Sequence, residues 1–317
     1  MKDLYNRKID YLRLSLTDRC QLRCRYCLPE DFSQWLPEGE KLNREEMIAI
    51  VRTFGSLGVR HLKLTGGEPL LYPDLAGFIK EVKTTTAIEE VTLTTNGMML
   101  KKLAPQLAEA GLDGINVSLD TLDGDKFREV TRRGGLATVL EGLALAASLI
   151  DNVKVNCVLT RELNQDEIVP IAKLARDLGV HVRFIEFMPM GQDYGAVSEE
   201  AALKELEQAF GPMKPWSGRL GNGPARYYQA PGFTGRIGFI SAVTRHFCQD
   251  CNRVRVTCDG LMKTCLFSRA DTDLRLALKR GNLTEAILEG LKVKPQKHLF
   301  HEVSTNKDTR SMVQIGG

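Results

Sequence analysis

The sequence contains no uninterrupted apolar run that approaches the roughly 18 residues of a membrane-spanning helix. Residues 1–16, MKDLYNRKIDYLRLSL, alternate charge with short apolar runs, so they lack the apolar region and small-residue cleavage site of a secretory signal. The net charge is only +3 over 317 residues, which gives little reason to bind nucleic acid or an anionic membrane nonspecifically. These absences predict a cytoplasmic protein that binds neither nucleic acid nor membrane.

The cysteines do not suggest a disulfide framework, which a reducing cytosol would not support. The chain has eight cysteines, and seven of them fall in two groups, at residues 20–27 and 248–265. Such clustering favours metal binding. The first group has three thiols, fewer than a closed all-cysteine zinc site requires.

Alternating strand and helix patterns fill the chain up to about residue 188. Six short β-branched stretches, typical of strands, begin near residues 11, 61, 91, 114, 153 and 182. Helical patterns lie between them, as at 43–58, where Asn43 and Glu46 form a capping box and Gly58 is a stop. The alternation predicts a parallel sheet with outer helices, an α/β fold with a partial (β/α)6 TIM-like barrel.

The pattern changes after residue 188. Residues 189–197 resemble a linker, 198–210 are helical in pattern, and 218–240 are glycine-rich strand and turn. Short helices are expected over 271–291, and the polar end of the chain closes with two glycines. We therefore expect a barrel domain at 1–188 and a C-terminal α+β extension at 189–317.

Residues able to do chemistry follow the predicted strands. Cys20, Cys24 and Cys27 follow the first strand. The later strand ends carry Gly66, Gly67, Asn96, Ser118 and Asp120. Active-site loops of barrel enzymes gather at the C-terminal strand ends, so we expect one active-site mouth there.

The three cysteines of the first group suit an open iron-sulfur cluster. Three thiolates hold three irons of a [4Fe-4S] cube and leave the fourth iron free to bind a substrate. A zinc knuckle that borrows a fourth ligand from elsewhere in the chain would explain CxxxCxxC taken alone.

This motif and its surroundings resemble the radical S-adenosylmethionine (SAM) superfamily. Tyr26 supplies the aromatic residue before the last cysteine, and LTGGEPLL at 64–71 resembles the GGE motif of that superfamily. Glycine lets the backbone approach a ligand closely. The resemblance implies SAM as a cofactor, with the following residues around it: Tyr26, Gly66, Gly67, Glu68, Ser118, Asn156 and the backbone of Met188.

The second cysteine group comprises Cys248, Cys251, Cys258 and Cys265. Spacing alone suggests a closed zinc ribbon. However, CNRVRVTCDGLMKTCLF resembles the pattern of the GTP 3',8-cyclases of molybdenum cofactor biosynthesis. That resemblance implies a second [4Fe-4S] cluster, carried by the C-terminal extension, whose free iron contacts guanine. Its ligands would be Cys248, Cys251 and Cys265. Cys258 departs from the pattern and is expected to be a spectator thiol, the alternative being a ligand that closes the cluster.

Arginine suits a polyphosphate because its planar fork bonds two oxygens at once. Arg253 and Arg255 alternate, so they project to one side if their segment is extended. The resemblance implies a substrate site formed by Arg13, Lys63, Thr94, Lys154, Arg183, Arg253, Val254 and Arg255. Two positions depart from that pattern. His61 stands where lysine or arginine is expected, and Lys63 stands where arginine is common. Lys63 keeps the charge but loses the bidentate geometry.

The chain ends in Gly316 and Gly317, which alone would suggest a disordered end. The resemblance instead implies a tail that enters the active site and acts in catalysis with Arg253 and Arg255. A buried core position is expected for the remaining thiol, Cys157.

The resemblance implies a lyase that converts GTP to 3',8-cyclo-7,8-dihydro-GTP with two [4Fe-4S] clusters and SAM. An adenosyl radical would take the 3' hydrogen of GTP, and the resulting carbon radical would attack C8 of guanine. Implied partners are an electron donor such as a flavodoxin or ferredoxin and, functionally, the cyclic pyranopterin monophosphate synthase. We expect a monomer or homodimer. A radical SAM enzyme that modifies a peptide and a nonenzymatic zinc protein are the alternatives.

Overall fold

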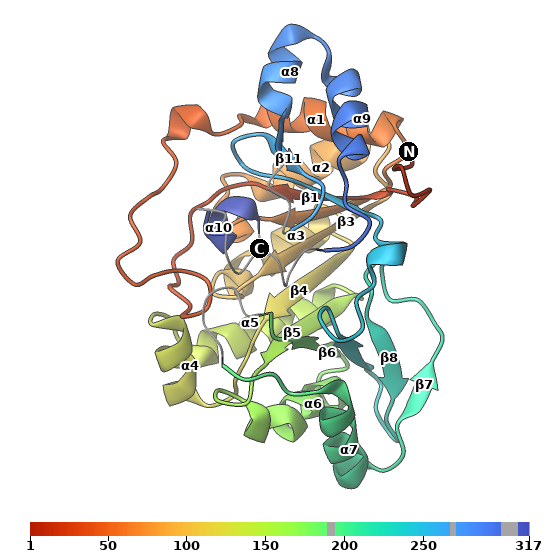
Figure 1. The fold of residues 1–317 in the computed structure, drawn as a ribbon. Coiled ribbons are helices and arrows are strands. Elements are labelled where there is room, and N and C mark those ends of the chain that lie inside the picture. Colours follow the sequence, from red (N-terminus) through yellow and green to blue (C-terminus); the bar gives the residue numbers. More distant parts are fainter. Residues whose placement is uncertain (189–193, 267–270, 299–309, 317) are drawn as a thin grey trace.

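The computed structural model describes residues 1–188, 194–266, 271–298 and 310–316, and its first half alternates strand and helix. Six strands begin within one residue of the predicted starts. These strands are β1 (Tyr11–Ser15), β2 (His61–Thr65), β3 (Glu90–Thr95), β4 (Gly114–Ser118), β5 (Val153–Leu159) and β6 (His181–Glu186). The six βα units of the partial barrel are therefore confirmed (Figure 1).

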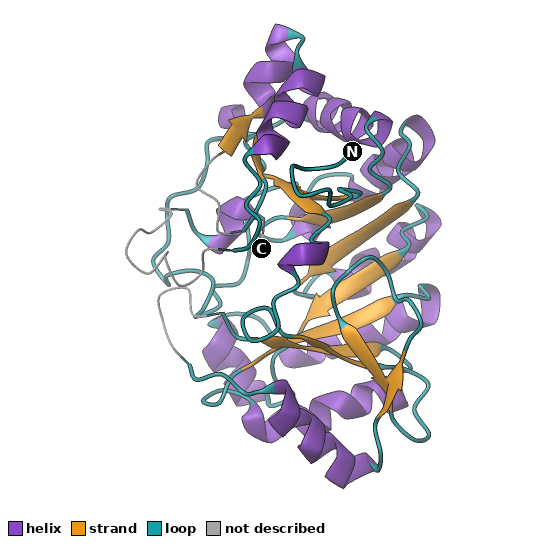
Figure 2. Ribbon diagram, turned by 45° about the vertical axis from the view of Figure 1, so that its right-hand side comes forward, coloured by secondary structure: helices purple, strands orange, loops and turns teal. Residues whose placement is uncertain are grey.

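Helices follow the strands and cover the outer face of the curved sheet (Figure 2). They are α1 (Arg44–Ser56), α2 (Leu75–Thr85), α3 (Leu100–Glu109), α4 (Gly124–Thr131), α5 (Leu136–Leu149) and α6 (Ile168–Asp177). The predicted capping box at Asn43 and Glu46 begins α1, and Gly58, at φ +96°, follows its end. Single 3-10 turns occur at η1 (Glu38–Glu40), η2 (Pro69–Leu71), η3 (Gln165–Glu167) and η4 (Cys248–Asp250).

The C-terminal region adds strands to both edges of the barrel sheet. Its strands are β7 (Lys214–Trp216), β8 (Arg226–Gln229), β9 (Ile237–Ile240), β10 (Arg253–Val256), β11 (Leu261–Lys263) and β12 (Asp271–Asp273). The order in the described part of the chain is β12-β11-β10-β1-β2-β3-β4-β5-β6-β9-β8-β7. Strands β10 and β9 run parallel to β1 and β6 respectively. The second cysteine group thereby lies beside the first strand of the barrel.

The remaining helices are α7 (Glu199–Phe210), α8 (Leu274–Arg280), α9 (Leu283–Lys292) and α10 (Met312–Ile315). Helices α7, α8 and α9 agree with the patterns predicted at 198–210 and 271–291, whereas α10 was not predicted and residues 271–273 form a strand instead of a helix. Within the described ranges, no helix combines the length and apolar character that crossing a membrane requires.

Side-chain alternation gives the sheet two chemically different faces. Leu12 and Leu14 of β1 and Leu62 of β2 pack in the core that the outer helices cover. Residues at the alternate positions, Arg13 and Lys63, are paired across the β1–β2 register and share the opposite, inner face. The fold thus places apolar side chains under the helices and polar ones inside the barrel.

Candidate active site

The first cysteine trio lies in the loop after β1. The pKa of Cys24 is raised well above its usual value by burial and by the neighbouring Cys27, and that of Cys27 is raised to about 12 by burial and by Cys20. The pKa of both thiols is therefore raised in part by another cysteine of the trio, so the three lie close together. The Asn96 side chain approaches Cys20 as well, with its Nδ2 donating to Sγ at 3.7 Å.

Gly66 and Gly67 let the end of β2 pack directly against the loop that leads to Cys20. Gly67 N donates to Thr17 O at 2.7 Å, and a Cβ at Gly67 would lie 2.3 Å from the carbonyl oxygen of Arg19. Gly66 has φ +151°, which favours glycine. The two glycines therefore seat the cysteine loop, and their direct contact with SAM stays a prediction.

Glu68 is buried and uses both carboxylate oxygens within the protein. Oε1 accepts from Leu70 N at 2.9 Å and Thr95 Oγ1 at 2.7 Å, and Oε2 accepts from Asn96 N at 2.8 Å. Burial raises the pKa of Glu68 to about 7, although these hydrogen bonds oppose the rise. Glu68 thus joins the ends of β2 and β3.

The other residues expected around SAM come from several strand ends. The Tyr26 hydroxyl donates to Asp120 Oδ2, just beyond β4. Ser118 and Asn156 are register partners in β4 and β5. Met188 follows β6 at the edge of the described residues. Since the strands are parallel, these positions belong to one end of the barrel.

A row of cations crosses the inner face of the sheet. Arg13 is the register partner of both Lys63 on β2 and Arg255 on β10. On the far side, Lys154 pairs with Asn116. Arg183 donates to Asn156 Oδ1 from Nε at 2.8 Å and from Nη2 at 2.6 Å.

Burial and mutual repulsion make this row unfavourable for cations. The pKa of Lys63 is lowered well below its usual value by burial, then by Arg183, Lys154 and Arg13. Burial and Arg183 lower the pKa of Lys154 to about 7, and burial lowers that of Arg13 to about 10. A bound polyanion would relieve this repulsion.

His61 and Glu90, the first residues of β2 and β3, form a pair beside this cationic row, with Nδ1 and Oε2 2.7 Å apart. Hydrogen bonding to His61 lowers the pKa of Glu90. Thr94, expected at the nucleotide, accepts from Asn116 Nδ2 at 3.4 Å. The side chain of Val254 is buried, so only its backbone remains to contact a substrate.

Two cavities lie near the N-terminal ends of the strands, and the smaller one reaches the cationic row. The smaller, about 30 Å³, is lined by Lys63, Lys154 and Arg183 among others, and holds about one water. The larger, about 770 Å³, is lined by Arg253 and loops around it. Asn222 and Gly223 border both, so the segment around residue 222 separates them.

The second cysteine trio is joined by backbone and side-chain donors. Burial raises the pKa of Cys248, and Cys265 and Cys251 contribute to that rise, so the three thiols are neighbours. His298 N donates to Cys248 Sγ at 3.4 Å. Arg7 Nη1 donates to the carbonyl oxygen of Cys248 at 2.8 Å.

Lys294, two residues beyond the end of α9, is a buried cation that contacts the second trio. Its Nζ donates to Thr264 O at 2.6 Å, to Arg253 O at 2.8 Å and to Cys251 Sγ at 3.4 Å. Burial alone would raise the pKa of Cys251, but Lys294 and Arg253 bring it below its usual value. This environment favours a thiolate, the form that binds metal.

Cys258 is buried just beyond the C-terminal end of β10, whereas Cys251 precedes the start of that strand. Its carbonyl oxygen accepts from Leu42 N at 2.7 Å. Burial raises the pKa of its thiol to about 12, with Asp18 as the next contributor and none of the other cysteines of its group. Cys258 thus lies with the loop after β1, which is compatible with a spectator role. Cys157 is buried in the core as expected.

The C-terminal tail returns to the barrel between β1, β2 and β10 (Figure 1). Gly316 O accepts from Arg255 Nη1 at 2.9 Å and from Thr65 Oγ1 at 3.3 Å. Gly316 has φ +76°, and a Cβ there would lie 3.0 Å from Thr65 Oγ1. Gly317 lies outside the described residues.

Both trios fit iron-sulfur clusters by their donor chemistry. Within the described residues, no group of three or more His, Cys, Asp or Glu side chains converges as it would around a single ion. In a cubane each thiolate binds a different iron, so its cysteines stand further apart than the ligands of one zinc ion. The neighbouring thiols and the donors at Cys20, Cys248 and Cys251 suit such a cluster.

Comparison with known proteins identifies the family. The radical SAM superfamily model matches residues 14–175, and the Molybdenum Cofactor Synthesis C model matches 180–300. Proteins named GTP 3',8-cyclase from Pelotomaculum thermopropionicum and Heliobacterium modesticaldum are 41% and 42% identical, over 100% of both chains in each comparison. The chain belongs to the GTP 3',8-cyclase family.

Solved structures share the fold of this cyclase family member. Streptococcus suis SuiB bound to S-adenosylmethionine matches with a TM-score of 0.62 at 14% identity, over 97% of this chain and 72% of that chain. Methylornithine synthase (PylB) matches with a TM-score of 0.54 at 14% identity, over 92% and 84%. At such low identity these likenesses support the radical SAM fold alone.

Sequence reasoning missed features that organise the cyclase site. Lys294 had no motif to mark it, because its neighbours in sequence carry no metal ligand. Asp120 was marked by its place at a strand end, but its bond to Tyr26 depends on a loop distant in sequence.

Proposed function

We propose that the chain converts GTP to 3',8-cyclo-7,8-dihydroguanosine 5'-triphosphate, an early step of molybdenum cofactor biosynthesis, as a radical SAM lyase. The observation that carries the proposal is the row of buried cations on the inner face of the barrel, with a cysteine trio at either side. Relatives that match over their full length and are named GTP 3',8-cyclase support the same assignment. Neither peptide modification nor a zinc-binding role is favoured.

The first [4Fe-4S] cluster would be held by Cys20, Cys24 and Cys27. With SAM bound, it supplies a carbon-centred radical that takes a hydrogen atom. The protein's part is to orient SAM and exclude water from the barrel. The residues proposed to do so are Tyr26, Gly66, Gly67, Glu68, Ser118, Asn156 and Met188.

The second [4Fe-4S] cluster would be held by Cys248, Cys251 and Cys265, near the guanine. The triphosphate would lie along the cationic row, because its charge offsets the repulsion that lowers the pKa of Lys63 and Lys154. The residues proposed to bind GTP are Arg13, Lys63, Thr94, Lys154, Arg183, Arg253, Val254 and Arg255.

Gly316 is proposed to hold Arg255 in place, since its carbonyl oxygen accepts from that guanidinium. Gly317 is proposed to extend the tail into the site. Together with Arg253 and Arg255 these glycines would form the catalytic group on the substrate side.

The finer aspects of the biology follow from the family. We propose a division into 1–188 and 189–317, a cytoplasmic location, and a monomer or homodimer. An electron donor such as a flavodoxin or ferredoxin would reduce the clusters. The cyclic pyranopterin monophosphate synthase would use the product.

The experiment that tests this function is anaerobic incubation of the reconstituted protein with GTP, SAM and dithionite. The proposal expects 5'-deoxyadenosine and the cyclised nucleotide with GTP, and little of either with ATP, CTP or UTP. Formation of 5'-deoxyadenosine that is equal for all four nucleotides would contradict the substrate assignment.

A further inference from the structure

Asp120, two residues beyond β4, joins the cysteine loop to the barrel. Its two carboxylate oxygens serve different segments: Oδ2 accepts from the Tyr26 hydroxyl, and Oδ1 accepts from Val158 N of β5 at 2.8 Å. Tyr26 directly precedes Cys27. A single carboxylate therefore connects a proposed cluster ligand loop to two strands.

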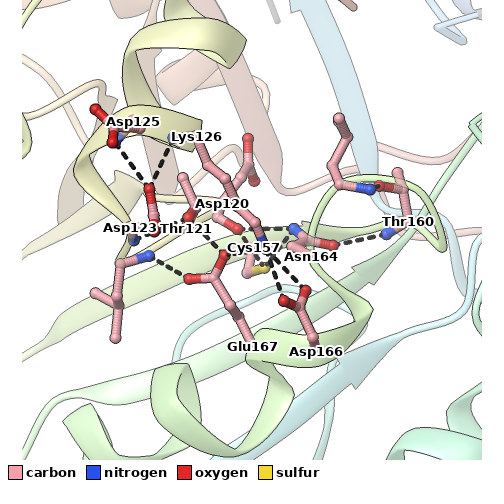
Figure 3. Close-up of polar contacts among 12 residues, drawn as sticks. Asp120, Thr121, Asp123, Asp125, Lys126, Cys157, Thr160, Asn164, Asp166 and Glu167 are labelled. Carbon is pink, nitrogen blue, oxygen red and sulfur yellow. Dashed lines mark hydrogen bonds and ion pairs between the residues drawn. The ribbon is translucent and has the colours of Figure 1, made fainter.

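The backbone of Asp120 is itself held by Asn164, a residue that is 1% exposed. Nδ2 of Asn164 donates to Asp120 O at 2.8 Å, and its Oδ1 accepts from Thr160 N at 2.9 Å (Figure 3). Nδ2 also donates to Val158 O at 2.9 Å. The backbone from which the Asp120 side chain extends is thus held in place.

Glu167 forms a second clamp in the same layer. It accepts from Thr121 Oγ1 and from Leu122 N, both at 2.6 Å (Figure 3). Like Asp120, Glu167 accepts from a hydroxyl and a backbone amide with one carboxylate, and it also forms an ion pair with Lys126 Nζ at 3.2 Å. Unlike Asp120, it has no hydrogen bond to the cysteine loop among the described contacts, which makes it a matched control.

Burying a carboxylate is costly, and a charged pair can often be replaced by apolar side chains at no loss of stability. Within the described residues, Asp120 forms hydrogen bonds to one hydroxyl and one amide and has no ion pair. Packing alone therefore does not explain an aspartate here. A requirement to accept from Tyr26 and Val158 together does.

We propose that Asp120 is a positioning residue that fixes the Tyr26 ring, and with it the cysteine loop, for SAM binding. The proposal rests on the proposed function, in which Tyr26 contacts SAM. Asparagine at position 120 keeps Oδ1 for Val158 N but places an NH2 group where the Tyr26 hydroxyl now donates, so the charge-assisted bond from Tyr26 is replaced by a weaker neutral bond in which Tyr26 accepts. Phenylalanine at position 26 would remove the same hydrogen bond from the other side.

The test compares Asp120→Asn, Tyr26→Phe, the double variant and Glu167→Gln in the anaerobically reconstituted full chain. Iron content and melting temperature report folding. The dissociation constant of SAM is measured from the change in the electron paramagnetic resonance (EPR) signal of the reduced first cluster. We expect about tenfold weaker SAM binding in each single variant, the size expected for one charge-assisted hydrogen bond, with normal iron content.

The double variant should bind SAM no more weakly than either single variant, because all three lack the same interaction. The dissociation constant of SAM in Glu167→Gln should stay within about twofold of the wild-type value, since the hydrogen bond between Asp120 and Tyr26 is unchanged. If Asp120→Asn fails to take up iron, Tyr26→Phe, which removes a single hydroxyl, decides the question.

Unchanged SAM affinity in Tyr26→Phe would overturn the proposal. So would an equal loss in Glu167→Gln, because the effect would then be general loosening of the layer. A wild-type protein that does not bind SAM would contradict the proposed function as well, whereas a failure confined to the variants would refute the positioning role only.

Discussion

Replacing Lys294 by methionine removes a buried ammonium that donates to Cys251 of the second cysteine trio. Lys294 is 2% exposed. Its ammonium donates to the carbonyl oxygens of Thr264 and Arg253 and to Cys251 Sγ. Methionine fills a similar volume but donates no hydrogen bond. The change therefore leaves two buried carbonyls without this donor and removes a positive charge from a thiolate.

The magnitude follows from these contacts. A buried polar group that loses its partner costs about 1–3 kcal/mol, so two carbonyls cost about 2–6 kcal/mol together. The free energy of unfolding of a whole protein is only about 5–15 kcal/mol. Because the cost falls on segments that carry Cys251 and Cys265, the local site should loosen before the barrel does.

Iron and sulfide analysis of the anaerobically reconstituted protein, with EPR, is the assay. Wild type should hold about eight irons per chain and Lys294→Met about four, with the SAM-responsive signal of the first cluster retained. Lys297→Met is the control, since Lys297 is exposed and only three residues away. Eight irons and an unchanged melting temperature in Lys294→Met would refute the reasoning.

Three further predictions concern the tail, the ligands and pH. Gly316→Ala must place a side chain at φ +76° against Thr65, at about 1–2 kcal/mol, so turnover should fall about tenfold with iron unchanged. Gly281→Ala, at φ +73° with no neighbour within 4 Å, should keep normal turnover; equal turnover in both variants would remove the tail's role. Cys258→Ala should keep both clusters and Cys265→Ala should lose the second, whereas equal iron loss would overturn the ligand choice. Lys154 has its pKa lowered to about 7, so between about pH 7 and its ordinary 10.5 the unfolded chain binds a proton that the folded chain does not, and stability should rise with pH. Melting temperatures of Lys154→Met across that window should rise less steeply, and an identical slope in both proteins would contradict the assignment.

Much of the barrel could be predicted from the sequence because its signals are local. Strand β5 is marked by its valines, Val153, Val155 and Val158, and the capping box of α1 is formed by residues 43–46, which are adjacent in the sequence. The first cysteine trio was found in the same way, from spacing within one loop.

Features that depend on distant segments could not be predicted. The pairing of β10 with β1 joins residues about 240 positions apart, and nothing in either strand specifies its neighbour. Lys294 is a lysine in an ordinary helical end until the fold buries it against Cys251. Gly66 and Gly67 were assigned to SAM, but their close contact is with the backbone at Thr17 and Arg19.

The measurement that tests the central claim most directly is Mössbauer and EPR spectroscopy of the iron-57 protein, titrated separately with SAM and with GTP. The account predicts two cubanes, each with one iron that lacks a cysteine ligand; SAM should alter the signal of the first, and GTP that of the second. Two centres with all irons bound by cysteine, and spectra that neither molecule changes, would contradict it.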